Sequence, residues 1–181
     1  MTDVVLETER LILRPMIAED VEPLIQLMLD PKVAAHLTET GEPRDRSVEW
    51  RGAASLIGHW QIRGFGFFSV IEKETGAWVG RVGPWQPDGW PGLEVGWSIA
   101  SDRWGRGYAV EAALATMRWT FDRFPDLSRL ISVIEPANTN SQAVARRVGE
   151  VKTTERFDFL TFTLDIWAVD RATWFDRFAD R

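Results

Sequence analysis

The hydrophobic residues near the start of the chain follow a helical spacing. Between residues 21 and 28 they recur at positions i, i+3, i+4 and i+7, which places them on one face of a helix. Pro31 is expected to stop this helix, because proline cannot continue its hydrogen bonding. A second helix is expected from Ser47, a residue type that caps helices well, to Gly64, which favours the backbone conformation that ends them.

From residue 65 the pattern becomes typical of strands. Residues 67–71 and 78–82 are predicted to form a hairpin around a turn at Gly76. Residues 86–92 are rich in turn-forming residues and are predicted to be a loop. Residues 93–99 alternate, so this strand has one apolar face and one small or polar face. The first face consists of Leu93, Val95, Trp97 and Ile99, and the second of Glu94, Gly96 and Ser98.

The most regular helical pattern begins after residues 100–106. Large apolar residues recur along one stripe of the segment that follows, and Pro125 is expected to end the helix. This stripe is expected to pack against the sheet. It consists of Val110, Leu114, Met117, Phe121 and Phe124.

The last third of the chain continues the mixture of strands and helices. Residues 130–134 predict a strand and residues 141–148 a short helix. Residues 151–169 predict two strands with a turn or bulge between Phe159 and Phe162, where the apolar alternation shifts. Asp170 is expected to cap a final helix. Because no repeat or linker interrupts the chain, it is predicted to be one mixed α/β domain over residues 1–181.

Charge and composition narrow the classes of function. The net charge is −6, which argues against a nucleic-acid surface and is compatible with a cationic substrate. The chain has no cysteine and two isolated histidines, His36 and His59, so we expect no metal site. No apolar run has the length of a membrane span or the form of a signal peptide, so we expect a cytoplasmic protein without a membrane partner.

One glycine-rich loop carries candidate chemistry. Gly105 and Gly107 precede the strongest helix, and without a Cβ their backbone N–H groups can approach a ligand closely. The N-terminus of the following helix adds further free amides, so the loop suits a phosphate or pyrophosphate. The same spacing of two glycines is also typical of an ordinary tight turn that binds no ligand. The loop is neither a dinucleotide fingerprint, since Val110 stands at the third glycine position, nor a Walker loop.

Four ordered motifs give this loop a context. They are LETERLILRP at residues 6–15, EVGW at 94–97, WGRGYAVEA at 104–112, and NTNS at 138–141 followed by a helix to Gly149. With these motifs the chain resembles the GNAT superfamily of acetyl-CoA-dependent N-acetyltransferases. Within it the likeness is greatest to the ribosomal-protein N-terminal acetyltransferases of the Rim type.

The resemblance implies a mixed central sheet of about seven strands, flanked by helices, in which residues 93–99 and 130–134 form a splayed pair. The pantetheine arm of acetyl-CoA would enter the gap, while the glycine loop holds the pyrophosphate. Arg103 and Arg106 would either screen the phosphates or remain solvated loop cations. The cofactor-binding residues implied are Trp97, Ser98, Ile99, Trp104, Gly105, Arg106, Gly107, Tyr108, Ala109, Asn138 and Ser141.

The resemblance also suggests catalytic groups. Glu94 is the candidate base for an attacking amine, and the alternative is a structural carboxylate. Ser141 is the candidate proton donor to the leaving thiolate, and the alternative is a helix cap. Glu111 is expected to be structural. The chain departs from the family in Ala145, where many members have tyrosine, and in Glu150, where phenylalanine is usual.

The function implied is transfer of the acetyl group of acetyl-CoA to a primary amine, by direct attack. The acceptor would be a protein N-terminal α-amine or a small-molecule amine, and the tryptophans Trp85 and Trp90 suggest a partly apolar acceptor. The missing tyrosine motivates an alternative, a non-catalytic acetyl-CoA-binding or regulatory module. A nucleotide-binding protein of unrelated fold is a third interpretation. A homodimer is possible, since relatives are often dimers.

Overall fold

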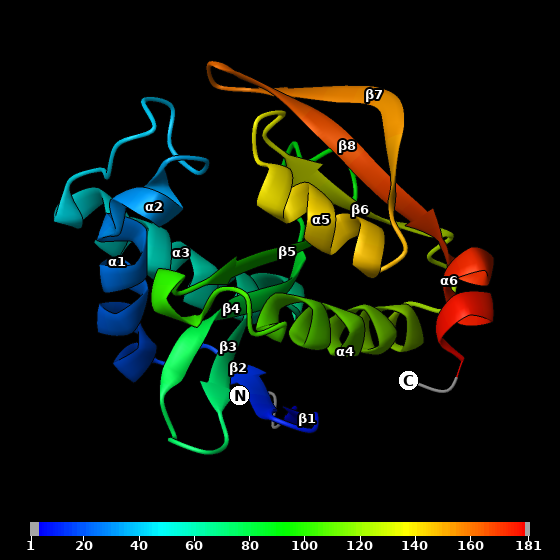
Figure 1. Cartoon of the computed structure of the whole chain (residues 1–181), viewed down its shortest axis with the longest axis horizontal. Helices are drawn as coiled ribbons and strands as arrows, with labels where there is room; N and C mark the ends of the chain where they lie inside the picture. The colour runs from blue at the N-terminus through cyan, green and yellow to red at the C-terminus, as the bar shows by residue number, and fades with distance from the viewer. Residues whose placement is uncertain (1–3, 180–181) are drawn as a thin grey trace.

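Eight strands form a continuous mixed sheet in the order β1-β2-β3-β4-β5-β6-β8-β7 (Figure 1). The computed structural model describes residues 4–179. Neighbouring strands are antiparallel, except for the central pair β5 and β6, which is parallel. The strands are β1 (Leu6–Glu7), β2 (Leu11–Pro15), β3 (Phe68–Glu72), β4 (Trp78–Trp85), β5 (Glu94–Ile99), β6 (Arg129–Ile134), β7 (Val151–Phe159) and β8 (Phe162–Asp170).

Helices cover both faces of this sheet (Figure 1). Within residues 4–179, none of them is long and apolar enough to cross a membrane. The helices are α1 (Val21–Leu29), α2 (Pro31–Ala34), α3 (Arg46–Arg63), α4 (Tyr108–Arg123), α5 (Thr139–Arg147) and α6 (Arg171–Phe178), with short 3-10 turns η1 (Ala18–Asp20) and η2 (Ser101–Arg103).

The apolar core is divided between the two faces. On one face, Phe121 of α4 and Trp174 of α6 pack with strand residues that include Phe68. On the other face, Leu24 of α1 packs with Phe67. Phe68 begins β3 and Phe67 directly precedes it, and the two neighbouring side chains fall into different clusters. The predicted α/β fold is thus confirmed, with eight strands rather than about seven.

Two predicted helix starts were wrong. The second helix begins at Arg46 with Asp45 as its N-cap, so Ser47 lies inside it. The short helix α5 begins at Thr139, and the Asn138 side chain caps it, so Ser141 does not. Asparagine and serine are both good capping residues, and sequence alone does not rank them.

Helix α4 packs in the core along the predicted stripe: Met117 and Phe121 are fully buried, and Val110, Leu114 and Phe124 pack against the same cluster. Val110 and Leu114 are only half-buried. Its buried face includes Ala112 and Ala113, whose small side chains permit close packing, and Thr116, whose hydroxyl bonds to the Ala113 carbonyl at 3.1 Å. The prediction rested on large apolar residues and so did not include these small and hydrogen-bonded side chains, which share the buried face with Met117 and Phe121.

The central strands β5 and β6 pair briefly and then separate. The register pairs Glu94 with Ile131. Beyond that point side chains bridge the strands: Ser132 Oγ lies 2.8 Å from the Val95 carbonyl oxygen, and the Val133 N–H faces Glu94 Oε1 at 3.5 Å. The expected splayed pair is therefore present, with polar side chains where backbone bonds would continue in an ordinary sheet.

The β7–β8 hairpin lies at the edge of the sheet, as Figure 1 shows in orange. Its turn falls between Phe159 and Phe162, which confirms the predicted break in alternation. Leu160 in this turn has φ +54°, a left-handed conformation that is uncommon outside glycine.

Candidate functional site

The glycine loop connects the end of β5 to α4. Gly105 and Gly107 have φ values of +76° and +83°, in the left-handed region that glycine adopts without strain. Gly107 is the N-cap of α4, so the amides of the first helical turn open toward the same space. The Trp104 indole N–H donates to the Ile99 carbonyl at 2.7 Å and ties the loop to the end of β5.

This loop forms one wall of a cleft of about 380 Å³, whose other walls come from α2, the end of β5 and α5. Two of the predicted site residues, Glu94 and Arg106, do not line it. The predicted residues that do line it are Trp97, Ser98, Ile99, Trp104, Gly105, Gly107, Tyr108, Ala109, Asn138 and Ser141.

The charge of the cleft is opposite to that of the whole chain. Lys32, Arg103 and Arg147 contribute cations, and no aspartate or glutamate is among the described residues that line it. The protein as a whole carries a net charge of −6. A cationic cleft with a glycine-rich helix N-terminus fits a ligand that carries phosphate groups.

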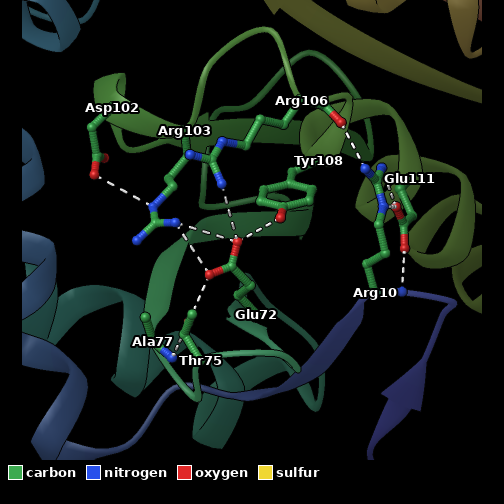
Figure 2. Close-up of polar contacts among 9 residues, drawn as sticks. All are labelled: Arg10, Glu72, Thr75, Ala77, Asp102, Arg103, Arg106, Tyr108 and Glu111. Carbon is green, nitrogen blue, oxygen red and sulfur yellow. Dashed lines mark hydrogen bonds and ion pairs between the residues drawn. The ribbon is translucent and has the colours of Figure 1, made fainter.

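Glu72, at the end of β3, gathers the polar side chains of the glycine loop (Figure 2). Its carboxylate accepts a hydrogen bond from Tyr108 Oη at 2.5 Å and lies 3.2 Å from Arg103 Nη1 and 3.6 Å from Arg106 Nη1. Hydrogen bonds from Thr75 and then Tyr108 lower the pKa of Glu72. Arg103 and Arg106 are therefore both ion-paired with Glu72, while 50% of the Arg106 side chain remains exposed to solvent.

A second carboxylate, Glu111, holds the loop to the N-terminal strands. It accepts hydrogen bonds from Thr8 Oγ1 at 2.6 Å, from the Arg10 backbone N–H at 2.9 Å and from Arg10 Nε at 2.7 Å. Arg10 also donates to the Arg106 carbonyl at 2.9 Å. Burial favours a raised pKa for Glu111, but these bonds outweigh it and lower the pKa. Two motifs a hundred residues apart in sequence thus form one clamp (Figure 2).

Ser141 lies on the opposite wall of the cleft. Its backbone N–H donates to Asn138 Oδ1 at 3.0 Å, and its hydroxyl oxygen accepts the Trp97 indole N–H at 3.3 Å. Because the hydroxyl acts as acceptor toward Trp97, its own hydrogen stays available for another partner. Tyr108, the one tyrosine of the chain, donates to Glu72 instead, and Ala145 is fully buried.

Glu94 lies at the splay, on the polar face of β5. It is 8% exposed, and the Trp90 indole N–H donates to its Oε2 at 2.6 Å. Burial raises the pKa of Glu94 to about 7, although the Trp90 bond and the charge of Arg81 oppose that rise. A Cβ at Gly96 would come within 3.2 Å of Glu94 Oε1 and 3.0 Å of the Phe67 ring, so glycine there leaves room for the carboxyl group.

Glu150 is a second buried carboxyl group near the splay. It is 2% exposed, its Oε1 lies 2.9 Å from Ser132 Oγ, and its Oε2 has no hydrogen-bond partner within the described structure. Burial raises the pKa of Glu150 well above its usual value. A protonated Glu150 can donate to Ser132, which then donates its single hydrogen to the Val95 carbonyl. Glu150, where the family usually has phenylalanine, therefore extends the side-chain link between β5 and β6 through Ser132.

Sequence reasoning missed several residues of this region. Arg10 belongs to the motif LETERLILRP at residues 6–15, but the motif alone predicts no role for its side chain. Lys32 and His36 reach the cleft from α2 and the turn after it, and Glu72 carries no signal in sequence because its partners are distant along the chain. His36 Nδ1 also lies 2.9 Å from Glu135 Oε2, which links that turn to the loop after β6.

Among residues 4–179, no group of three histidine, cysteine, aspartate or glutamate side chains is arranged to hold an ion.

Comparison with known proteins identifies the family. A family model described as an acetyltransferase (GNAT) domain matches residues 10–151. The uncharacterized N-acetyltransferase p20 of Bacillus licheniformis is 33% identical over 138 residues, which is 75% of this chain and 76% of that protein. An acetyltransferase structure from Agrobacterium tumefaciens is 30% identical, with a TM-score of 0.81 over 93% of this chain and 95% of that one.

A Rim-type enzyme shares the fold. The structure of RimL, a ribosomal L7/L12 α-N-protein acetyltransferase in complex with coenzyme A, has a TM-score of 0.71 over 92% of this chain and 98% of that one, at 17% identity. At that identity the likeness concerns the fold alone. Together with the family match, it confirms the predicted resemblance. The chain belongs to the GNAT acetyltransferase family and is an acetyl-transferring enzyme.

Proposed function

We propose that this enzyme transfers the acetyl group of acetyl-CoA by direct attack of a primary amine, either a peptide N-terminal α-amine or a small-molecule amine. The observation that carries the proposal is the cationic cleft, which joins the glycine loop to Ser141 and opens beside the β5–β6 splay. Acetyl-CoA, as co-substrate, supplies an activated acyl group in its thioester.

The cofactor-binding residues divide between the two ends of acetyl-CoA. The backbone amides of Gly105, Gly107 and the first turn of α4 would bind the pyrophosphate. Arg103 and Arg147 would add positive charge near the phosphates. The backbone of residues 97–99, together with Asn138, would hold the pantetheine arm. This division follows the cleft, since each of these residues lines it.

Glu94 is proposed as the base. An amine reaches the site largely protonated, because α-amines have a pKa of about 8 and lysine-like amines of about 10. The pKa of Glu94, about 7, allows the carboxylate to accept that proton near neutral pH. Since Glu94 lies outside the cleft that would hold acetyl-CoA, the amine would approach from the polar face of β5.

Ser141 is proposed as the group that stabilises the departing thiolate. Its hydrogen is available because Trp97 occupies one lone pair of the hydroxyl oxygen. A hydrogen bond to a charged group contributes about 1.5–3 kcal/mol, enough to matter without a tyrosine.

Purified protein, acetyl-CoA and a panel of peptide and small-molecule amines test the proposal through thiol release and the acetylated product. We expect turnover with at least one amine, and its loss in Glu94→Gln. Glu74→Gln, in the exposed turn after β3, serves as control. Tight acetyl-CoA binding without thiol release from any amine would contradict the proposal and favour a non-catalytic module.

A further inference from the structure

Three aromatic rings from two separate segments meet beside Glu94. Trp90, in the loop before β5, lies with its ring centroid 5.0 Å from that of Phe157 and 5.2 Å from that of Phe159. The two phenylalanines stack at 5.9 Å on one side of β7. We call these three side chains the aromatic cluster.

The cluster is joined directly to the proposed base. The Trp90 indole N–H donates to Glu94 Oε2 at 2.6 Å, so the ring that contacts both phenylalanines also contacts the carboxyl group. An amine that approaches Glu94 on this side therefore brings its substituent against the aromatic cluster.

The cluster is also open to solvent at its outer end. Phe159 is 39% exposed and the adjacent Leu160 is 68% exposed, while Trp90 and Phe157 are half-buried. Figure 1 shows the turn of the β7–β8 hairpin projecting beyond strand β6. An apolar surface that leads from solvent to a buried carboxylate can take an amine whose substituent is itself apolar.

The charges near Glu94 favour an acceptor with one ammonium group over an acceptor with two or more. Arg81, half-buried in β4 with its guanidinium 4.0 Å from the Phe67 ring centroid, attracts Glu94 electrostatically. This cation would repel a further positive charge on the acceptor. Two further carboxyl groups act on this site electrostatically: Glu49 attracts Arg81, and Glu150, which contacts Ser132, is influenced by Glu94.

We propose that Trp90, Phe157 and Phe159 form an acceptor subsite that selects primary amines with an apolar group next to the amino group. The inference rests on the function proposed above. The shared chemistry is the amine with its apolar neighbour, whether it begins a peptide or belongs to a free small molecule.

A matched acceptor series tests the subsite. Alaninamide, leucinamide and phenylalaninamide differ in side chain but have similar amines, and Phe-Gly-Gly and Ala-Gly-Gly provide the peptide arm. Spermidine represents acceptors with several cations. We expect kcat/KM to rise at least about tenfold from the alanine to the phenylalanine compound in one or both arms, with spermidine below phenylalaninamide.

Phe157→Ala and Phe159→Ala are expected to reduce that ratio to threefold or less. Val151→Ala, which removes an exposed apolar side chain at the other end of β7, is expected to keep it. Thermal unfolding would confirm that the variants fold. Acetylation of every acceptor without side-chain preference, a preference that survives both phenylalanine substitutions, or a preference for spermidine would overturn the subsite alone. Absence of turnover with any amine would overturn the proposed function as well.

Discussion

The carboxyl groups at the two ends of this site have pKa values that are shifted in opposite directions. At the glycine loop, Glu72 and Glu111 have several hydrogen-bond donors each, and these partners lower their pKa. At the β5–β6 splay, Glu94 and Glu150 are buried and have few donors, and burial raises their pKa. Compared with an exposed glutamate, the loop carboxylates therefore favour the charged form and the carboxyl groups at the splay favour the protonated form.

Under the proposed function, this difference would separate the groups that bind acetyl-CoA from the group that acts as base. A loop that must present its amides to a phosphate benefits from rigid anchoring, and fully paired carboxylates provide it. A base must bind and release a proton near the working pH, which a fully paired carboxylate does poorly. We therefore expect substitutions at the loop to change acetyl-CoA affinity and substitutions at the splay to change turnover.

The largest effect is expected for Glu94→Gln. Loss of a positioned base lowers kcat/KM by about 100-fold or more. Wild-type kcat/KM is expected to rise with pH through about 7, because the base acts in its ionised form. In the variant this rise is expected to disappear, with the same acceptor used for both proteins so that the titration of the amine is common to them. An unchanged pH profile would assign Glu94 a structural role.

Gly107→Val is expected to weaken acetyl-CoA binding about tenfold or more, as measured by calorimetry. Valine is strained at φ +83°, and its side chain blocks the backbone approach. Gly64→Val is the control, since Gly64 has φ +73° at the end of α3, away from the cleft. Equal loss of acetyl-CoA affinity in the two variants would indicate that the loop is an ordinary turn with no special part in binding.

Ser141→Ala is expected to lower kcat about tenfold with little change in melting temperature. The hydroxyl makes no cap, so its loss removes the proposed hydrogen bond to the thiolate and the long bond from the Trp97 indole N–H, at 3.3 Å. Asn138→Ala, in contrast, removes the helix cap and is expected to cost about 1 kcal/mol of stability. If Ser141→Ala lowered stability and left kcat intact, the hydroxyl would have no part in the reaction.

Glu111→Gln is expected to raise KM for acetyl-CoA about fivefold and to change kcat less than twofold. The neutral amide weakens the charge-assisted bonds to Arg10, so the loop loses part of its anchoring. Glu22→Gln, which breaks an exposed ion pair with Arg46 elsewhere, controls for general loss of charge. A fall in kcat without a change in KM would contradict the division of roles.

The smallest effects are expected in stability, and they have opposite signs. The raised pKa of Glu150 destabilises the fold above the unfolded-state value near 4.5, so Glu150→Gln should raise the melting temperature at pH 7.5 by about 2 °C or more. The lowered pKa of Glu72 stabilises the fold above that value, so Glu72→Gln should lower it. In thermal scans the Glu150 difference should disappear as the pH falls to about 4.5, whereas the Glu72 difference should persist to that pH and shrink only below it. Changes in melting temperature of the same sign in both variants would contradict the opposite pKa shifts at the loop and at the splay.

Local patterns in the sequence predicted much of the fold. The alternation at residues 93–99 corresponds to strand β5, and the break after Phe159 corresponds to the turn between β7 and β8. Both were predictable because the backbone of a strand fixes the direction of its side chains. Gly105 and Gly107 likewise adopt positive φ as a turn of this type requires. The sequence did not identify the N-cap of α5, because Ser141 and Asn138 are residue types that cap helices equally well.

The sequence by itself determined the order of elements, the glycine loop and the family to which the chain belongs. Only the tertiary structure decided which charges meet. Glu72 with Arg103, Arg10 with Glu111, and Trp90 with Phe157 are brought together by the sheet order and not by any local spacing. Periodicity encodes the direction of a side chain relative to its own backbone, whereas a partner across the sheet depends on how all the elements pack.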